Sequence, residues 1–320
     1  MTTRGGVLIV IPCLNEAEAL PGLLRRLLAD SGDASIVVAD GGSTDGSRAI
    51  VERLAERDPR VRLLDNPARL QSAGINAAVR THGAGARWLV RVDAHCDYPA
   101  DYASRLVAVG EARDVTSVVV PMVSRGTACF QIAAAAAQNS RLGTGGSPHR
   151  HVGEGGLVDH GHHALMRLDL FTRVGGYRED MSHNEDAELD LRLVAAGGRI
   201  WLEPSLALGY LPRRTIGALW RQYRSYGAGR ARTLRLHDRR PKPRQALPLL
   251  VPAAAFLALA APVHPLFAAP LAAWALLCLG AGAVVGARAG GGCALGSGVA
   301  AMTMHLAWGL GFLGRVLRRG

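Results

Sequence analysis

Short apolar runs alternate with amphipathic segments along the first third of the chain. Residues 7–12, 36–39, 61–64 and 88–92 form short apolar runs, which are typical of buried strands. The segments between them, 16–30, 47–57 and 72–81, have the character of helices, and the first carries a helically spaced set of leucines: Leu20, Leu23, Leu24, Leu27 and Leu28. Strands alternating with helices predict βαβ units and a parallel sheet, so the predicted fold class is α/β.

The same reasoning extends to residues 163–197. Residues 163–168 form a strand-like run, and a helix is expected to start near Asp169. A stronger helix follows, with Asn184 at its N-cap position, acidic residues in its first turn and Gly197 at its end.

The composition changes after residue 245. Residues 246–287 contain no Asp, Glu, Lys or Arg, and neither do residues 293–314. Because about 20 apolar residues span a bilayer, 264–287 and 293–314 are predicted transmembrane helices. The segment 247–261 is shorter and contains two prolines, so a re-entrant or interfacial position also fits. The alternative is a buried helical hairpin of a soluble domain, and the choice between two and three membrane helices stays open.

Positive charge is concentrated before this apolar region. The chain has a formal net charge of +11, and residues 213–244 alone carry eleven Lys and Arg and one acid. Such a segment suits nucleic acid or an anionic membrane face. Nucleic acid is the weaker alternative, because the segment has few aromatic residues for stacking, among them Tyr223 and Tyr226, and no known binding motif. By the positive-inside rule, residues 1–245 are expected in the cytoplasm.

The five cysteines are an odd number without CxxC spacing. This usage argues against a disulfide framework and for a reducing compartment.

Polar side chains follow three of the predicted strands, in "PCLNE" (12–16), "DGGSTDG" (40–46) and "DAHCDYP" (93–99). Ligands of parallel sheets bind beyond the carboxyl ends of the strands, so these loops are expected to line one crevice. Asp93 and His95, two residues apart, can share a divalent ion with a phosphate group. The alternative is a solvated turn capped by Asp93.

Two further groups of acids suit the same crevice. Asp40 precedes Gly41 and Gly42, which would let backbone approach a ligand whose base or ribose the carboxylate binds; a plain turn is the alternative. Glu185 and Asp186 stand at the start of a helix. Either the helix dipole stabilises the two acids there, or one of them serves as a general base.

Two other polar clusters leave their roles open. Adjacent His162 and His163 lack the wider spacing of zinc ligands, so a strand or loop facing the acceptor is preferred to a zinc site. Residues 221–224, "RQYR", can neutralise phosphate charge or anchor the chain to anionic lipid.

Five segments in this order resemble a bacterial family 2 glycosyltransferase. They are "VLIVIPCLNE", "VVADGGSTDG", "VRVDAHCDYP", "HNEDAELDLRL" and "RQYRSYGAGRART". The most similar group is the membrane-associated, succinoglycan type that builds exopolysaccharide repeat units on a lipid carrier. The resemblance covers roughly residues 6–245 and, more loosely, the apolar tail.

The resemblance implies a GT-A fold, which is α/β and Rossmann-like with a mostly parallel sheet, followed by C-terminal transmembrane helices. It also implies an inverting mechanism and a nucleotide-diphosphate sugar donor, with UDP-glucose the expected one. Matching positions give these expected roles: Pro12, Cys13 and Glu16 border the nucleotide; Asp40 faces uracil or ribose; Asp93 and His95 hold Mn²⁺ or Mg²⁺; Asp186 is the catalytic base beside Glu185; Gln222 and Arg224 lie near the diphosphate or acceptor.

Three departures from the family pattern refine this expectation. Gly41 stands where the family often has a second aspartate, and His95 ends the metal motif in place of an aspartate. The late motif "RQYRS" lacks the tryptophan of processive synthases, which favours transfer of a single sugar.

The expected acceptor is a polyprenyl-diphosphate-linked saccharide at the bacterial inner membrane. The alternatives are transfer to a polyprenyl phosphate, a membrane-tethered nucleic-acid-binding protein and an inactive scaffold of the same fold. The expected organisation is a cytoplasmic catalytic domain over 1–230, a basic juxtamembrane segment over 231–245 and a membrane region over 246–320.

Overall fold

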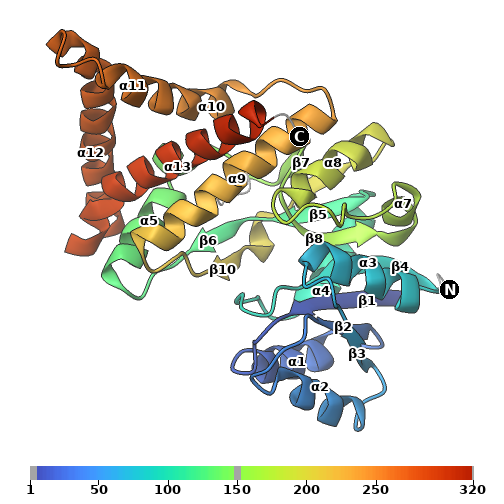
Figure 1. Ribbon diagram of the computed structural model, residues 1–320. Coiled ribbons are helices and arrows are strands. Elements are labelled where there is room, and N and C mark those ends of the chain that lie inside the picture. The colour runs from blue at the N-terminus through green and yellow to red at the C-terminus, as the bar shows by residue number, and fades with distance from the viewer. Residues whose placement is uncertain (1–5, 148–152, 319–320) are drawn as a thin grey trace. The chain divides into compact units, whose positions relative to one another are not determined.

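The computed structural model describes residues 6–147 and 153–318 (Figure 1). The chain forms two compact units that are interleaved in sequence. The first comprises the described residues within Met1–Pro121 and Val152–Leu208, and the second those within Met122–His151 and Gly209–Gly320.

An eight-stranded sheet with the order β3-β2-β1-β4-β8-β5-β9-β7 organises the first unit. Its strands are β1 (Gly6–Cys13), β2 (Ser35–Asp40), β3 (Val61–Asp65), β4 (Ala86–Arg91), β5 (Ser117–Val120), β7 (Gly156–Val158), β8 (His162–Arg167) and β9 (Ile200–Leu202). β1 pairs in parallel with β2 and β4, and β2 with β3, as the alternating pattern predicts. β8 enters antiparallel between β4 and β5, so the sheet is mixed.

The helices of this unit are α1 (Leu20–Asp30), α2 (Ser47–Ala55), α3 (Gln71–His82), α4 (Tyr102–Ala112), α7 (Leu168–Arg173) and α8 (Glu185–Ala195), with a 3-10 turn η2 (Pro204–Leu206). α1 begins four residues later than the pattern predicts, because Asn15 adopts a left-handed conformation with φ 58° and residues 14–19 form a loop. Asn184 does occupy the N-cap position of α8, but its side chain makes no capping hydrogen bond.

The core of the first unit packs helices against the sheet. One cluster joins Leu8, Val37 and Leu89 of the strands to Ile75 of α3 and Leu189 of α8, all fully buried. The apolar runs seen in the sequence therefore become the buried interior, and the polar residues that follow them emerge at the carboxyl edge of the sheet.

The second unit is mainly helical. A two-stranded sheet of β6 (Met122–Ser124) and β10 (Leu208–Tyr210) accompanies its helices. These are α5 (Cys129–Gln138), α6 (Arg141–Thr144), α9 (Ile216–Leu236), α10 (Pro243–Ala246), η3 (Leu247–Leu249), α11 (Leu250–Ala258), η4 (Pro265–Ala268), α12 (Ala269–Ala289), η5 (Gly292–Gly296) and α13 (Ser297–Leu317). Within the described residues, Pro265–Ala289 and Gly292–Leu317 are long and apolar enough to cross a membrane, by length and composition alone.

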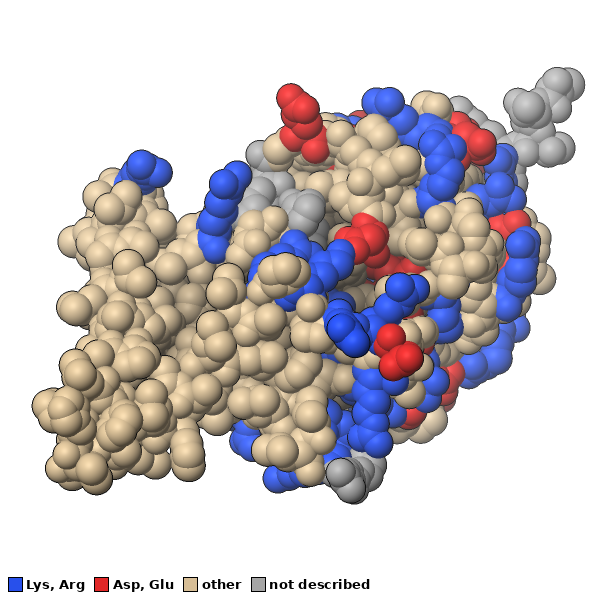
Figure 2. All heavy atoms as spheres, turned by 90° about the horizontal axis from the view of Figure 1, so that it is seen from above, with Lys and Arg blue, Asp and Glu red and all other residues tan. Residues whose placement is uncertain are grey.

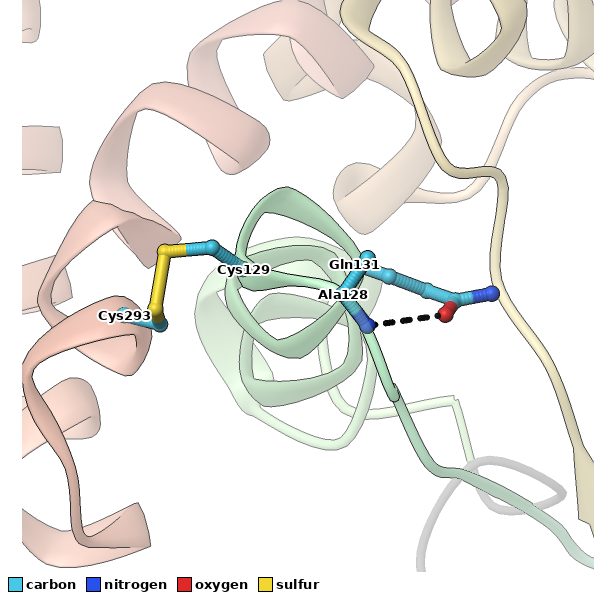
Figure 3. The surroundings of a disulfide bond; sticks show 4 residues. All are labelled: Ala128, Cys129, Gln131 and Cys293. Atoms are coloured by element: carbon cyan, nitrogen blue, oxygen red, sulfur yellow. Dashed lines mark hydrogen bonds between the residues drawn. A yellow bond between two sulfur atoms is a disulfide. The ribbon is translucent and has the colours of Figure 1, made fainter.

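A disulfide joins Cys129 of α5 to Cys293 of η5 (Figure 3). The cysteine usage predicted no disulfide framework, and for this pair that prediction is wrong. The two cysteines are 164 residues apart, and spacing arguments detect only local motifs. Cys13, Cys96 and Cys278 are free and buried.

Candidate active site

The loops after β1 and β2 are bound to one another by hydrogen bonds. Cys13 and Asp40 lie opposite each other in the β1–β2 register. The backbone N–H of Asn15 donates to Ser43 Oγ at 2.8 Å, and that of Glu16 donates to Ser47 Oγ at 2.9 Å. "PCLNE" and "DGGSTDG" therefore form one rim, as predicted.

Asp40 is buried at the base of this rim. Its carboxylate accepts the N–H groups of Gly42 at 2.9 Å and Ser43 at 3.1 Å, and it pairs with Arg48 at 3.0 Å. Burial acts to raise the pKa of Asp40, but the hydrogen bonds from Ser43 and Arg48 outweigh it and lower the pKa. The left-handed φ of Gly42, 83°, is a conformation that glycine adopts without strain. Asp40 is thus ionised, and its carboxylate stabilises the turn that contains Gly42 and Ser43.

Asp93 follows β4, and polar side chains from several elements surround it. Gln71 donates to Asp93 Oδ1 at 2.6 Å, and the Tyr98 hydroxyl lies 2.6 Å from the Asp93 backbone nitrogen. His162 Nε2, from β8, is 3.6 Å from Asp93 Oδ2, too far for a hydrogen bond. Burial acts to raise the pKa of Asp93, and the charge of Arg91 outweighs it and lowers the pKa on balance.

His95 reaches across to the first loop. Its Nδ1 lies 3.0 Å from Glu16 Oε1, and 62% of its side chain is exposed. The two residues come from the loops after β4 and β1, so the third predicted loop joins the same rim. This contact also connects two of the predicted site residues.

Arg91 links the loop after β4 to α8. The Arg91 side chain is 4% exposed; its Nη1 pairs with Asp186 Oδ1, and its Nε lies 3.4 Å from Asp93 Oδ1. Two acids from distant parts of the sequence therefore share one buried cation. Burial opposes the charge of Asp186, but the pairing with Arg91 and then His163 lowers its pKa strongly.

Glu185 behaves differently from its neighbour. Burial, reinforced by the charge of Asp186, raises the pKa of Glu185 to about 7. The pKa values of the two adjacent acids in the first turn of α8 are thus shifted in opposite directions. Such a difference between neighbouring acids is found at functional sites.

A buried polar network lies behind Asp186, and the sequence reasoning missed it. His163 Nδ1 lies 2.6 Å from the Tyr177 hydroxyl, and His163 Nε2 lies 2.7 Å from Asp190 Oδ1. His160 Nδ1 lies 2.8 Å from the other oxygen of Asp190. Burial acts to lower the pKa of His163, but Asp190 and then Asp186 raise it.

The adjacent histidines of "DHGHH" separate because successive strand residues face opposite sides of a sheet. His162 turns toward Asp93, and His163 turns toward Asp190. The single arginine within the apolar strand 88–92 was a further signal, since a buried charge needs a partner.

The donor atoms around Asp93 fit a divalent ion that is completed by a ligand. Asp93 Oδ2 accepts no hydrogen bond from a described residue, and His95 uses only Nδ1 in its contact with Glu16. Within 6–147 and 153–318, no three His, Cys, Asp or Glu side chains form a ready-made metal site. A carboxylate and an imidazole suit Mn²⁺ or Mg²⁺ when phosphate and water supply the other ligands.

Gln222 and Arg224 lie on α9, in the second unit. The Gln222 amide nitrogen donates to the hydroxyls of Tyr210 at 2.8 Å and Tyr226 at 2.9 Å. Its buried carbonyl oxygen has no hydrogen-bond partner among the described residues. Arg224 is exposed.

The fold and the carboxylate-rich edge of the sheet define a glycosyltransferase of the GT-A type. A mannosyltransferase from Pyrobaculum calidifontis, solved with GDP-Man and Mn²⁺, has the same fold with a TM-score of 0.61 and 21% identity, covering 100% of this chain and 89% of that one. GalNAc-T7, solved with UDP, GalNAc and Mn²⁺, matches with a TM-score of 0.50 and 15% identity over 70% of this chain and 48% of its own.

Residues 8–175 match the model of glycosyl transferase family 2, and the chain belongs to this family. It is similar to the succinoglycan biosynthesis protein ExoA of Rhizobium meliloti (strain 1021), with 50% identity over 314 residues, 97% of this chain and 94% of the relative. A shorter match, 34% identity over 114 residues, joins 33% of the chain to 41% of a polyprenol monophosphomannose synthase of Mycolicibacterium smegmatis. The sequence-based predictions of family, fold and enzyme class are confirmed.

Proposed function

We propose that the protein moves one sugar from a nucleotide-diphosphate donor to a lipid-linked saccharide in exopolysaccharide biosynthesis. The observation that carries the proposal is the cluster in which Arg91 joins Asp93 to Asp186 at the carboxyl edge of the sheet. The similarity to a succinoglycan biosynthesis protein along nearly the whole chain supports the exopolysaccharide role. UDP-glucose is the expected donor, and the cytoplasmic face of the bacterial inner membrane is the expected location.

The donor would lie along the rim formed by the loops after β1, β2 and β4. Pro12, Cys13 and Glu16 would border the nucleotide, with Asp40 near its base or ribose and Asp93 near its phosphates. Asp93 and His95 would hold Mn²⁺ or Mg²⁺, which neutralises the charge of the leaving diphosphate when it is bound.

Asp186 would act as the base, with Glu185 beside it. Asp186 is 18% exposed and has one carboxylate oxygen turned to Arg91, so the other oxygen is available to an acceptor hydroxyl. The hydroxyl oxygen attacks the anomeric carbon, its proton passes to Asp186, and the bond to the diphosphate oxygen breaks with inversion. Arg91 keeps Asp186 ionised before the reaction, and the same pairing lowers the basicity of its carboxylate.

The acceptor side of the proposal involves the second unit. Gln222 and Arg224 would contact the diphosphate or the acceptor, because an arginine pairs well with phosphate oxygens. In this proposal residues 1–230 form the catalytic domain, 231–245 the basic segment and 246–320 the membrane-associated region.

Transfer to a polyprenyl monophosphate is the second candidate. Its support is the match to a polyprenol monophosphomannose synthase, which covers 33% of the chain. Product analysis separates the two candidates: the first adds a sugar to an existing saccharide, and the second places a sugar on a bare monophosphate carrier.

The test is a panel of radiolabelled nucleotide sugars with membranes containing the protein, lipid extract, and Mn²⁺, Mg²⁺ or EDTA. Asp186→Asn should abolish turnover while the nucleotide still binds, and Asp180→Asn, half-exposed in an ion pair with Arg178, is the matched control. Near-normal turnover in Asp186→Asn would remove this residue as the base. Transfer of no sugar by the unaltered protein would remove the proposal.

A further inference from the structure

α13 is the central helix of the second unit. Within the apolar span Gly292–Leu317, 44% of the most apolar window is buried inside the protein, against 11% for Pro265–Ala289. Ala300, Ala301, Met304 and Ala307 of α13 form the middle of a buried cluster. α13 is therefore covered by its own protein over a much larger share of its surface than the span Pro265–Ala289.

α9 lies along α13 over much of its length (Figure 1). The two helices meet without intervening side chains at two glycines. A Cβ on Gly227 would come within 2.0 Å of the Trp308 carbonyl oxygen, and a Cβ on Gly311 within 2.0 Å of the Arg224 carbonyl oxygen. The backbones therefore pack directly on one another.

The contact continues on both sides of these glycines in parallel order. Leu219 and Tyr223 of α9 pack in the cluster of Ala300 and Met304, and Leu234 of α9 packs with Phe312. Residues 300–312 of α13 are thus accompanied by α9 for about 18 Å at 1.5 Å per residue. That distance is more than half of a hydrocarbon core of about 30 Å.

α9 also carries arginines along its length. The side chains of Arg221, Arg224 and Arg235 are exposed, and the Arg224 backbone itself packs against Gly311 of α13. If α13 crossed the bilayer, α9 would accompany it and place these guanidinium groups against lipid tails. Arginines are costly at that depth and normally face a protein interior or water.

The turn between α12 and α13 is held by α5. Cys293 of η5 is bonded to Cys129 (Figure 3), and a Cβ on Gly296 would lie 3.3 Å from the Ala133 side chain. Packing alone therefore holds the turn next to α5 whether or not the disulfide is formed. Because α5 also packs in the cluster of α9 and α13, the turn lies on the same side of the membrane as they do.

The uncharged face of the unit is formed by α11, η4 and α12. Its exposed apolar side chains are Phe256, Leu259, Val263, Leu266, Leu276 and Leu277, each at least 70% exposed. Figure 2 shows an extended, mostly uncharged surface at the left, with basic groups only along its upper edge, where Figure 1 places α11 and α12. A lipid leaflet fits this face, since its tails cover apolar side chains and its anionic headgroups suit the arginines of α9.

We propose that neither α12 nor α13 crosses the bilayer, and that the unit docks into a single anionic leaflet through α11, η4 and α12. The α12–α13 turn then stays on the side of the basic segment around Arg239. Both long apolar helices are accounted for, one as the core of the unit and one as its lipid-facing surface.

Cysteine accessibility tests the topology without any donor or acceptor, so its outcome is independent of the proposed function. Gly292→Cys is placed in the turn, where an added Cβ meets nothing within 4 Å, in a Cys129→Ser, Cys293→Ser full-length chain. Arg239→Cys in the same chain marks the side of the basic segment. A membrane-impermeant maleimide is applied to intact spheroplasts and to inverted vesicles.

The expected result is labelling of both positions in inverted vesicles and of neither in spheroplasts. Labelling of Gly292→Cys in spheroplasts, or its protection from both sides until detergent is added, overturns the proposal. If the Cys129→Ser, Cys293→Ser background does not fold, an epitope inserted between Gly290 and Gly291 of the native chain gives the same comparison with antibody. Antibody binding in spheroplasts then overturns the proposal.

Discussion

Arg91→Met tests whether the buried cation organises the site. The substitution keeps an unbranched side chain of similar length but removes the charge between Asp93 and Asp186. Breaking a buried ion pair costs about 3–5 kcal/mol because the remaining charge has no partner. Asp186 is 18% exposed, so water relieves part of this cost and the expected loss is about 3 kcal/mol. At about 2–4 °C per kcal/mol, the midpoint of thermal unfolding falls by about 6–12 °C.

The dependence on pH follows from the direction of the pKa shifts. The pKa of Asp186 is lowered in the folded protein, so its pairing stabilises the fold above the pKa of an unfolded carboxyl, about 3.9, and is lost as the pH falls. The loss of stability caused by Arg91→Met is therefore largest near pH 7. It shrinks toward pH 5, because the unpaired buried acid takes up a proton.

The assay is thermal unfolding in detergent at pH 7 and pH 5, followed by tryptophan fluorescence, to which the buried Trp88 contributes as one of five tryptophans. Arg91→Met is compared with Asp186→Asn and with the double variant. The double variant should be more stable than Arg91→Met, since it leaves one fewer buried charge unpaired. Equal stability of wild type and Arg91→Met, or additive losses in the double variant, would refute the reasoning.

Two further substitutions probe the metal site and the helix packing. Asp93→Ala should lose activity together with its dependence on Mn²⁺ or Mg²⁺ in the transfer assay; an active variant that EDTA still inhibits would move the ion elsewhere. Gly227→Ala should lower the stability of the second unit by about 1–3 kcal/mol, because its Cβ meets a backbone oxygen at 2.0 Å. Gly280→Ala, with open space around its Cβ, is the control in α12, and equal unfolding midpoints of the two variants would contradict the packing.

Local patterns in the sequence predict the first half of the sheet well. The strands β1 to β4 follow from short apolar runs, and their loops follow from the polar residues at each carboxyl end. The adjacency of those loops follows from parallel pairing alone. Glu16 and His95 come together for this reason.

The groups behind Asp186 could not be predicted in the same way. Asp190 meets His160 and His163 across 30 and 27 residues, and only the antiparallel entry of β8 brings them together. No spacing rule encodes such a contact. The disulfide between Cys129 and Cys293 is hidden for the same reason.

In the apolar tail, hydropathy alone cannot distinguish a core helix from a membrane helix. A core helix and a membrane helix have the same length and composition, and they differ only in what covers them. In α13 the cover is α9, with exposed Arg221, Arg224 and Arg235. An arginine at the bilayer centre costs about 2.5–3.5 kcal/mol on an insertion scale, and Arg221 and Arg235 lie about 21 Å apart along α9, so at most part of the set would reach that depth. The cost is avoided only if α9 separates from α13, which would expose the faces packed at Gly227 and Gly311, or if α13 stays out of the hydrocarbon core. The second course keeps every contact of the unit, and for that reason we propose that α13 forms the core of a leaflet-bound helical unit.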